Sequence, residues 1–505
     1  MHTNRTSPPT QSAEPREGAF ALEPEALRAF AHRLVDDYCD GLGTLAREPA
    51  WRPMPDEVRA RLATDLPRQG LGLARAYEAF ARDVRPHRYG NIHPRFFGWV
   101  NGSALPAGVL ADFLASAMNS NVGGFDQSAV AVEEQVLGWL RELFGLPRAG
   151  DGILTSGGSV ANLLGLAAAR HAHAPDAREH GLAGGPRLVL YGSEESHSSI
   201  DKAVELLGLG RASFRRLPVD AHYRLRLETL EEALAADRAR GLVPFAVVGN
   251  AGTVNTGAID PLAELAALAR REGLWLHVDG AFGALAWLCP ERRAELAGLP
   301  EADSLAFDLH KWMYLPSDVG CVLVRRPGGL AQAFASEAAY LSGLSGGLTA
   351  ARGVPFKDRG IELTRRFRAL KPWFALQVHG LATFEQAIRA NLDQARHLAA
   401  RVEREPRLEL LAPAPLNVVC FRYRGDGSLP DAALDALNRT LLVRLQTGGL
   451  AVASHTVLGG RFALRAAITN HRTDLADLDQ VVAAVLALGL ALEREDRPLS
   501  TPTRP

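Results

Sequence analysis

Lysine is scarce in this sequence of 505 residues, in which only four of the 56 basic residues are lysine and the rest are arginine. Arginine therefore supplies positive charge almost everywhere. Lysine differs from arginine because it can lose its proton and form a Schiff base with a carbonyl group. One of the four, Lys311, follows His310 at the end of a short apolar run. Its retention in this background indicates a chemical role, and chance survival of a few lysines is the alternative that the rest of the sequence must exclude.

Cysteine is equally scarce, and neither sign of charge is in surplus. The four cysteines are far apart and form no CxxC pair: Cys39, Cys289, Cys321 and Cys420. This spacing argues against a disulfide framework or a metal site and fits reduced thiols in the cytoplasm. The net charge of −1 provides no basic surplus for binding nucleic acid or an anionic membrane.

Long apolar runs are also missing. The longest ones, such as 481–493, are too short to span a bilayer. The first residues are polar and rich in proline, without the apolar core of a signal peptide. We therefore expect a soluble, cytoplasmic protein whose two ends, 1–20 and 494–505, are disordered tails.

The chain is too long for one ordinary domain, and its patterns divide it into three parts. Apolar residues at helical spacing predict amphipathic helices over 24–46 and 55–84. A loop rich in glycine, proline and aromatic residues follows at 85–103. We group these segments as an N-terminal helical part, 21–103.

The second part, 104–375, is a predicted α/β domain. Its apolar runs predict strands at 152–156, 187–192, 244–250, 274–280, 304–309 and 320–326. Helical patterns lie at about 104–118 and 128–145 and begin again near 158, 198 and 260. Buried strands that alternate with helices indicate a mainly parallel sheet covered by helices on both faces.

The third part, 376–493, has the pattern of a small α+β domain. A long helix over about 371–404 leads into it. The elements that follow are a strand at 417–425, a helix at 430–446, strands near 449–455 and 461–468, and a helix at 474–492.

Unusual residues follow the predicted strands, at the edge where a parallel sheet binds ligands. In the segment 155–163, two glycines and Ser159 join a strand to a helix, and such a turn lets backbone N–H groups bind an anion. A turn that caps a helix and binds nothing has the same pattern and is the commoner case.

Three further strand-end residues have both a functional and a structural explanation. Asp279 closes an apolar strand, where a carboxylate needs a partner such as a protonated pyridine nitrogen or a salt bridge. His197 follows another strand and is suited to stacking on a planar ring or to capping a helix. Thr253 lies in a loop that offers a hydroxyl group or is an ordinary turn.

The five strand-end sites together are more informative than any one of them alone. An anion site, a stacking ring, a hydroxyl group, an acid partner and a Schiff-base lysine occur in order, each at a strand end. Pyridoxal 5′-phosphate requires all five, since its phosphate, ring, pyridine nitrogen and aldehyde each need a partner. The sequence therefore predicts that Lys311 carries this cofactor.

Several motifs in the same order resemble the group II PLP-dependent decarboxylases over about 85–475. They are HPRFFGW, TSGGSVANLLGLAAAR, SHSSIDKA, AGTVNTGAIDPL, WLHVDGAFG, DLHKW, RRFRALKPWF and LNRTLLVRL. The resemblance implies fold type I, with N-terminal and C-terminal extensions of the large PLP-binding domain. It also implies an obligate homodimer with active sites at the interface.

The resemblance assigns roles to single residues. It implies that Lys311 forms the Schiff base, His197 stacks on the cofactor ring and Asp279 pairs with the pyridine nitrogen. The other positions that it places around the cofactor, some of them near the phosphate, are Gly158, Ser159, Thr253, Ala281 and His310. The segment 334–347 matches the family's catalytic loop and keeps its tyrosine, Tyr340. The resemblance implies that this tyrosine protonates the substrate's α-carbon after carbon dioxide leaves. An ordinary half-buried tyrosine is the alternative.

Two departures from the family pattern concern the cofactor and the substrate. Asp308 stands where many relatives have a neutral asparagine near the phosphate. Residues 100–102 differ from those of the aromatic decarboxylases, although Trp99 and Phe97 are candidates for the floor of an aromatic pocket.

These observations together predict an L-amino-acid decarboxylase, with an aromatic amino acid as the preferred substrate and an amine and carbon dioxide as products. The alternatives are an aldehyde synthase or aminotransferase on the same fold, and a catalytically silent PLP-fold binding protein. The expected partners are the amino acid and a second copy of the chain, without nucleic acid or membrane.

Overall fold

The computed structural model describes residues 20–336, 346–350 and 353–496. The described residues form two compact units: the first lies within 20–49 and 53–88, and the second consists of residues 50–52 and the described residues from 89 to 496. Tyr340 lies outside the described residues, and so do both predicted tails apart from residues 20 and 494–496.

The first unit is helical. Its elements are α1 (Pro24–Thr44), α2 (Asp56–Leu62), α3 (Leu73–Ala79) and the short helices Leu45–Arg47, Phe80–Val84 and Arg85–His87. The single helix predicted over 55–84 is wrong, because Pro67 and two glycines interrupt the pattern and Gly72 has a φ of 76°. Asp83 ties the unit together by accepting hydrogen bonds from Arg61 and Arg82.

The second unit contains a seven-stranded sheet in the order β2-β8-β7-β6-β5-β3-β4. Its strands are β2 (Asp151–Thr155), β3 (Leu188–Ser193), β4 (Phe214–Leu217), β5 (Val243–Asn250), β6 (Trp275–Asp279), β7 (Ser304–Asp308) and β8 (Gly320–Val324). Only β8 runs against its two neighbours, so the predicted mainly parallel sheet is confirmed. The sequence missed β4, a four-residue strand with two arginines in the middle.

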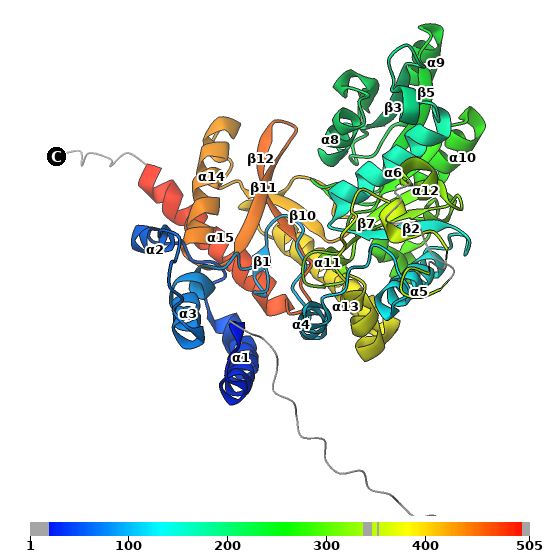
Figure 1. The fold of residues 1–505 in the computed structure, drawn as a ribbon. Coiled ribbons are helices and arrows are strands. Elements are labelled where there is room, and N and C mark those ends of the chain that lie inside the picture. The colour runs from blue at the N-terminus through cyan, green and yellow to red at the C-terminus, as the bar shows by residue number, and fades with distance from the viewer. Residues whose placement is uncertain (1–19, 337–345, 351–352, 497–505) are drawn as a thin grey trace, which may run out of the picture. The chain divides into compact units, whose positions relative to one another are not determined.

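The second unit adds nine α-helices around and beside this sheet in its described residues, and several of them lie against it (Figure 1). They are α4 (Pro106–Met118), α5 (Ser128–Leu143), α6 (Gly158–His173), α7 (Ala177–His180), α8 (Ser199–Leu206), α9 (Leu227–Ala239), α10 (Leu262–Glu272), α11 (Leu309–Trp312) and α12 (Gly329–Phe334). Short 3₁₀ helices cover Arg211–Ser213, Gly283–Leu288, Pro290–Arg292, Leu299–Glu301 and Phe356–Asp358. Helix α6 crosses one face of the sheet and contacts β2, β5, β6, β7 and β8.

A smaller sheet has the order β1-β11-β12-β10-β9. Its strands are β1 (Phe96–Phe97), β9 (Leu408–Leu410), β10 (Val418–Tyr423), β11 (Val452–Leu458) and β12 (Arg461–Ala467), and α14 (Asp431–Thr447) and α15 (Leu475–Asp496) accompany them. Phe96 pairs with Val452, so residues 89–103, grouped above with the N-terminal helices, lie in the second unit.

Helix α13 (Leu370–Arg404) connects the two sheets. Its residues Phe384 and Ile388 belong to the core of the large sheet, whereas Leu398 and Val402 belong to the core of the small one. The helix is kinked at Gly380, whose φ of 70° lies in the left-handed region that favours glycine.

Helix α15 is longer and more apolar than the sequence reading allowed. Its segment Leu475–Glu495 has a mean hydropathy of 1.9 and satisfies the length and composition of a membrane span. Its apolar residues nevertheless form part of the core of the small sheet: Leu478, Val481, Val482, Val485 and Leu492. We therefore assign α15 as a core helix, since burial inside a domain explains its apolar composition.

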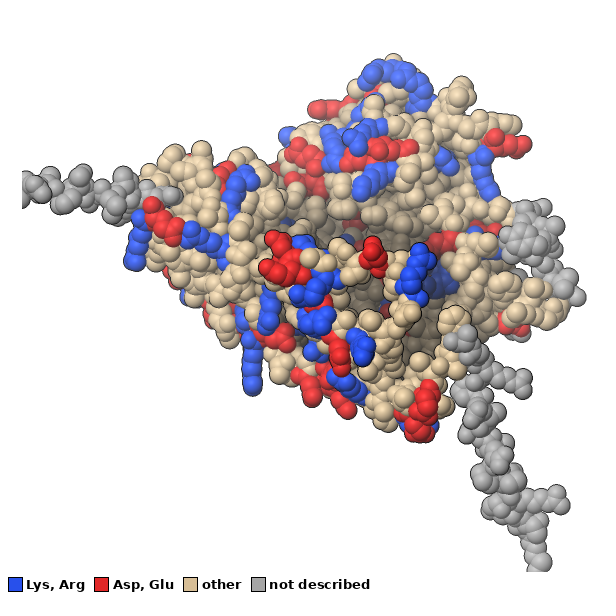
Figure 2. Space-filling view, turned by 60° about the vertical axis from the view of Figure 1, so that its left-hand side comes forward, with Lys and Arg blue, Asp and Glu red and all other residues tan. Residues whose placement is uncertain are grey.

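On the face shown in Figure 2, basic and acidic side chains are interspersed.

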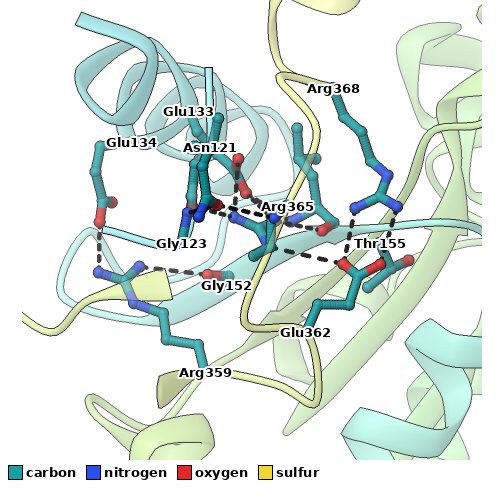
Figure 3. Close-up of polar contacts among 12 residues, drawn as sticks. Asn121, Gly123, Glu133, Glu134, Gly152, Thr155, Arg359, Glu362, Arg365 and Arg368 are labelled. Carbon is teal, nitrogen blue, oxygen red and sulfur yellow. Dashed lines mark hydrogen bonds and ion pairs between the residues drawn. The ribbon is translucent and has the colours of Figure 1, made fainter. Parts of the chain in front are cut away.

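A buried ion pair fixes β2, the strand that leads to the predicted anion site (Figure 3). The side chains of Arg365 and Glu133 are both 0% exposed and lie 2.6 Å apart. Arg365 donates to the carbonyl oxygen of Leu154 (2.6 Å), and Glu133 accepts the Leu154 N–H (3.2 Å). Arg359 donates to the carbonyl oxygen of Gly152 in the same strand. Segments far apart in sequence thus hold the backbone of β2 in place.

Candidate active site

A cavity of about 420 Å³ lies at the carboxyl ends of the parallel strands of the large sheet. The predicted site residues that line it are Gly158, Ser159, His197, Asp279, Ala281, His310 and Lys311. They follow β2, β3, β6 and β7, so strands far apart in the sequence bring them to one place. The proposed Schiff-base lysine and the proposed acid partner therefore line the same cavity.

Lys311 reaches the cavity from α11, a helix of one turn directly after β7. Three positions separate it from Asp308, and the turn brings its Nζ to 3.0 Å from Asp308 Oδ2. The lysine side chain is 22% exposed, whereas that of Asp308 is 3% exposed. The amine is therefore accessible from the cavity, with one buried carboxylate beside it.

Asp308 lies against the start of α6. A Cβ atom on Gly158 would lie 2.9 Å from Asp308 Oδ2, so glycine allows this close approach. Oδ1 of Asp308 is buried and has no hydrogen-bond partner among the described residues. A buried carboxylate oxygen of this kind favours a cation or a proton nearby, and Lys311 supplies the positive charge.

The first turn of α6 is suited to binding an anion. The helix has 16 residues and begins at Gly158, and no side chain caps its N-terminus. Its first N–H groups have no partner within the helix, and the helix dipole is positive at this end. Ser159 is exposed at the cavity and adds a hydroxyl group. This end of the helix is the predicted site for the cofactor phosphate.

Asp279 is 4% exposed at the end of β6. Its Oδ1 accepts the N–H of Ala281 (3.1 Å), and its Oδ2 accepts a hydrogen bond from Asn162 Nδ2 (2.9 Å). Among residues 20–336, 346–350 and 353–496 the carboxylate forms no ion pair, which disfavours the structural salt bridge considered above. Each oxygen keeps a free lone pair for a protonated ring nitrogen.

His197 lies just before α8 and is exposed at the cavity. Its Nδ1 accepts the N–H of Ser199 (3.1 Å) and lies 2.8 Å from the Ser199 hydroxyl. A backbone N–H can only donate, so the proton of the neutral ring is on Nε2. Burial lowers the pKa of His197 and outweighs the negative charge of Asp279, which acts in the opposite direction. The neutral ring can stack on a planar cofactor.

Two residues named from the sequence are not in the cavity. Thr253 is 1% exposed, and its hydroxyl lies 3.1 Å from that of Thr256 and accepts the N–H of Ala258, so it stabilises its own loop. Phe97 is 1% exposed and belongs to the core of the small sheet, so it does not floor a substrate pocket. Trp99 does line the cavity and stacks on Tyr89, with ring centroids 5.8 Å apart.

Sequence reasoning missed Asn162 and Ser199, which both line the cavity and contact predicted residues. Asn162 lies one helical turn after Gly158, so the same helix face presents both to the cavity. That spacing was a usable signal. The hydrogen bond from Asn162 to Asp279 joins residues 117 positions apart, which no local pattern reveals.

These residues fit pyridoxal 5′-phosphate. The uncapped end of α6 matches its phosphate, Asp279 matches its ring nitrogen, and Lys311 matches its aldehyde. Asp308 is the unusual feature, because it brings a carboxylate to the phosphate end of the cavity, next to Lys311.

His277, two residues before Asp279, gives folding a pH dependence. Its side chain is 0% exposed, and burial lowers its pKa to about 4. In the unfolded chain histidine titrates near its ordinary pKa of about 6.5. Between these values the unfolded chain binds a proton that the folded chain excludes.

We therefore expect the free energy of unfolding to fall as the pH drops from about 6.5 toward 4, with His277 contributing up to about 3 kcal/mol. Urea unfolding at pH 7.5 and pH 5.0 measures this loss. His277→Gln should lose less stability over that interval than the parent, whereas His222→Gln, on the exposed surface, should match the parent. Equal losses in the parent and His277→Gln would contradict the assignment.

Comparisons with known proteins identify one family. A family model described as "Pyridoxal-dependent decarboxylase conserved domain" matches residues 55–424. An aromatic-L-amino-acid decarboxylase from Bacillus atrophaeus is 34% identical over 471 residues, covering 92% of this chain and 96% of the relative. Tryptophan decarboxylase 1 from Oryza sativa subsp. japonica is 32% identical, covering 92% and 94% of the two chains.

A solved structure gives the same result for the fold. The structure of Oryza sativa TDC with PLP and tryptamine matches with a TM-score of 0.87 and 29% sequence identity. The match covers 93% of this chain and 99% of that one. The fold class, the family resemblance and the cofactor predicted from the sequence are therefore confirmed.

Proposed function

Because this chain belongs to the pyridoxal-dependent decarboxylase family, we propose that it decarboxylates an aromatic L-amino acid to the corresponding amine and carbon dioxide. The observation that carries the proposal is the cavity shared by Lys311, Asp279, His197 and the start of α6. The aromatic preference rests on Trp99 and Phe282, which line the same cavity, and on the named activities of the relatives.

The cofactor, when bound, supplies an aldehyde for covalent attachment and a ring that accepts the electrons left behind by carbon dioxide. The residues of this chain would hold it at three points. The first turn of α6 would bind the phosphate, Lys311 would bind the aldehyde carbon through Nζ, and Asp279 would keep a proton on the ring nitrogen. His197 would cover one face of the ring and exclude water from it.

Proton movement at Lys311 involves Asp308. The amine must be unprotonated to attack a carbonyl carbon. Oδ2 of Asp308, 3.0 Å from Nζ, is positioned to accept the proton that the amine loses. The same carboxylate would return the proton when the amine of Lys311 is released from the aldehyde carbon. Asp308 would therefore exchange its proton with Nζ of Lys311.

The test is a screen of the twenty amino acids and the hydroxylated aromatic ones for carbon dioxide release, with the amine identified in parallel. We expect turnover of tryptophan, tyrosine, phenylalanine or a hydroxylated derivative, and little or none of glutamate. Release from an acidic or aliphatic amino acid alone would refute the aromatic preference. A yellow protein that decarboxylates nothing would favour the silent binding protein.

Tyr340 distinguishes amine formation from aldehyde formation. It is proposed as the acid that protonates the α-carbon, and it lies outside the described residues. We expect Tyr340→Phe to divert product from amine toward aldehyde, because the phenolic donor is lost. This route consumes molecular oxygen as the oxidant and water, and it releases ammonia and hydrogen peroxide. Chromatography of both products and a peroxide assay measure the ratio. Amine formation at the parental rate would show that another group donates the proton.

We also propose that the protein is a homodimer. Leu110, Phe113, Leu114 and Met118 lie on one face of α4 and are 43 to 69% exposed. A run of large apolar side chains on one exposed face favours association. Within the first unit, α1 buries none of its residues, so it also offers an apolar surface.

Charge on this face of α4 is therefore expected to disrupt the dimer. Phe113→Glu should shift the sedimenting mass from two chains toward one, because a carboxylate opposite apolar side chains is poorly tolerated. Leu206→Glu is the matched control, because Leu206 is 74% exposed on α8. A parent protein that sediments as one chain would refute the homodimer.

We propose a cytoplasmic location on the basis of the cysteines. All four are free, and Cys289, Cys321 and Cys420 are buried. Buried thiols without disulfides suit a reducing compartment. Cell fractionation against a known cytoplasmic enzyme tests this placement.

A further inference from the structure

A chain of buried polar side chains leads away from Asp279 into the core beneath α6. Trp275, His277 and Asp279 alternate along β6 and point to the same face of the sheet. Asn162 comes from α6 and Ser304 from β7. Asn162 is 1% exposed, His277 and Ser304 are 0% exposed, and Trp275 is 6% exposed. Polar groups buried this deeply need satisfied hydrogen bonds to be stable.

Four hydrogen bonds connect these residues in one line. Trp275 Nε1 lies 2.7 Å from Ser304 Oγ, which lies 2.7 Å from His277 Nδ1. His277 Nε2 lies 2.9 Å from Asn162 Oδ1, and Asn162 Nδ2 lies 2.9 Å from Asp279 Oδ2. Helix α6 comes close enough for this because residue 165 is glycine: a Cβ there would lie 2.6 Å from His277 Cε1.

The direction of the bonds follows from the cavity end. His197 Nδ1 accepts the backbone N–H of Ser199, so the Ser199 hydroxyl donates to the same atom and must accept from Asn162, as the carboxylate of Asp279 does. Asn162 Oδ1 therefore faces His277, and the hydroxyl of Ser304 accepts the indole N–H of Trp275 and donates to His277 Nδ1. The ring of His277 then carries its single proton on Nε2, which donates to Asn162 Oδ1. The amide of Asn162 therefore presents N–H groups, and never its oxygen, to Asp279. Burial lowers the pKa of His277, which keeps the ring neutral and the direction fixed.

The second N–H of Asn162 extends the chain to the other side of the cavity. It donates to Ser199 Oγ (2.9 Å), whose own proton is directed to Nδ1 of His197 (2.8 Å). One amide group thus touches the residue proposed for the ring nitrogen and, through Ser199, the residue proposed to stack on the ring. Both orientations depend on which way the amide of Asn162 faces.

We propose that Trp275, Ser304, His277 and Asn162 are positioning residues, whose one-way hydrogen-bond chain sets the orientation and basicity of Asp279 toward the cofactor ring nitrogen. The proposal rests on the proposed function through the pairing of Asp279 with that nitrogen. An N–H donor on Asp279 stabilises its charged form, whereas an amide oxygen in the same place would repel it. Reversal of the chain would therefore weaken the carboxylate's hold on the proton of the ring nitrogen.

Ser304→Ala tests the chain without touching the cavity, because Ser304 is not among the residues that line it. The variant removes one hydroxyl group and frees His277 to carry its proton on Nδ1. The titratable groups that share the cavity or the hydrogen-bonded line with Asp279, namely His197, His277, Asp308, His310 and Lys311, are all kept. The readouts are the dissociation constant of pyridoxal 5′-phosphate and the pH midpoint of the bound cofactor's visible absorption band, both measured without substrate.

We expect Ser304→Ala to move the midpoint of that band by about 0.5 pH unit or more and to weaken cofactor binding about three- to tenfold, the effect of one lost buried hydrogen bond. Once a substrate is known, kcat should fall while KM changes little. Ser454→Ala is the matched control, because this serine is also buried, at 5% exposed, but bonds to Arg465 in the small sheet. It should leave both readouts at their parental values.

Trp275→Phe provides a second variant, should Ser304→Ala fail to fold. It removes only the indole donor to Ser304, and it should move the midpoint the same way by a smaller amount. An unchanged midpoint and dissociation constant in a folded Ser304→Ala protein, or in Trp275→Phe if only that folds, would overturn the proposal. Neither readout needs turnover. A parent protein that decarboxylates no aromatic amino acid would therefore refute the proposed function, while the role of the hydrogen-bonded residues could still be tested.

Discussion

Replacement of Lys311 with alanine is expected to lower carbon dioxide release about a thousandfold or more, the largest effect we predict for activity. The amine of Lys311 is the nucleophile that faces the cavity, and Asp308 is its nearest carboxylate, 3.0 Å from Nζ. No other lysine lies in α11 or β7 to replace Lys311, because the other three are at positions 202, 357 and 371. Rates at saturating cofactor and substrate measure the loss.

Lys311→Arg is the sharper version of this experiment. Arginine keeps the positive charge beside Asp308, but it cannot form a Schiff base under ordinary conditions. We expect Lys311→Arg to fold and to be as inactive as Lys311→Ala, whereas Lys202→Ala, an exposed lysine on α8, should keep parental activity. Substantial turnover by Lys311→Arg would mean that Lys311 supplies charge and not covalent chemistry.

The largest expected effect on stability comes from Arg365. Replacing it with methionine should lower the free energy of unfolding by about 3–5 kcal/mol, because Glu133 would then be a buried charge without its partner. Both side chains are 0% exposed. Arg365 also donates to the carbonyl oxygens of Leu154 and Val122, which would lose these bonds.

The neighbouring residue is a natural control. Arg366 is 58% exposed and lies 3.2 Å from Asp112, and a surface pair of this kind contributes at most about 1 kcal/mol. Urea unfolding of the cofactor-free protein should therefore separate Arg365→Met clearly from Arg366→Met. Equal stabilities would show that the buried pair does not hold β2. The double replacement Arg365→Met with Glu133→Met should recover part of the loss, because no uncompensated charge remains.

The sheet was predictable because its strands are buried on both faces. Runs such as 244–250 and 274–280 are apolar apart from His277 and the polar residues at their ends, so each strand and the residue that ends it could be read directly. Asp279 and Lys311 were found for that reason. Strand β4 escaped because two of its four residues are arginines at the edge of the sheet.

The parts that could not be predicted depend on direction and long-range contact. Phe97 was read as a pocket residue, but its strand pairs with β11 and its side chain points into the core of the small sheet. Thr253 has the right loop but turns its hydroxyl toward Thr256. The line of hydrogen-bonded side chains behind Asp279 joins α6 to β6 and β7. Its hydrogen bonds form only after the protein has folded.

The scarcity of lysine also makes the central claim directly measurable. Borohydride reduces a Schiff base to a stable secondary amine, so the cofactor remains attached to the residue that carried it. Digestion after arginine and mass spectrometry of the reduced holoenzyme can then assign the modified residue among only four lysines. We predict loss of the visible band and a pyridoxyl group on the peptide that contains Lys311 alone. A pyridoxyl group on Lys202, Lys357 or Lys371, or a bleached protein without any modified peptide, would contradict the account.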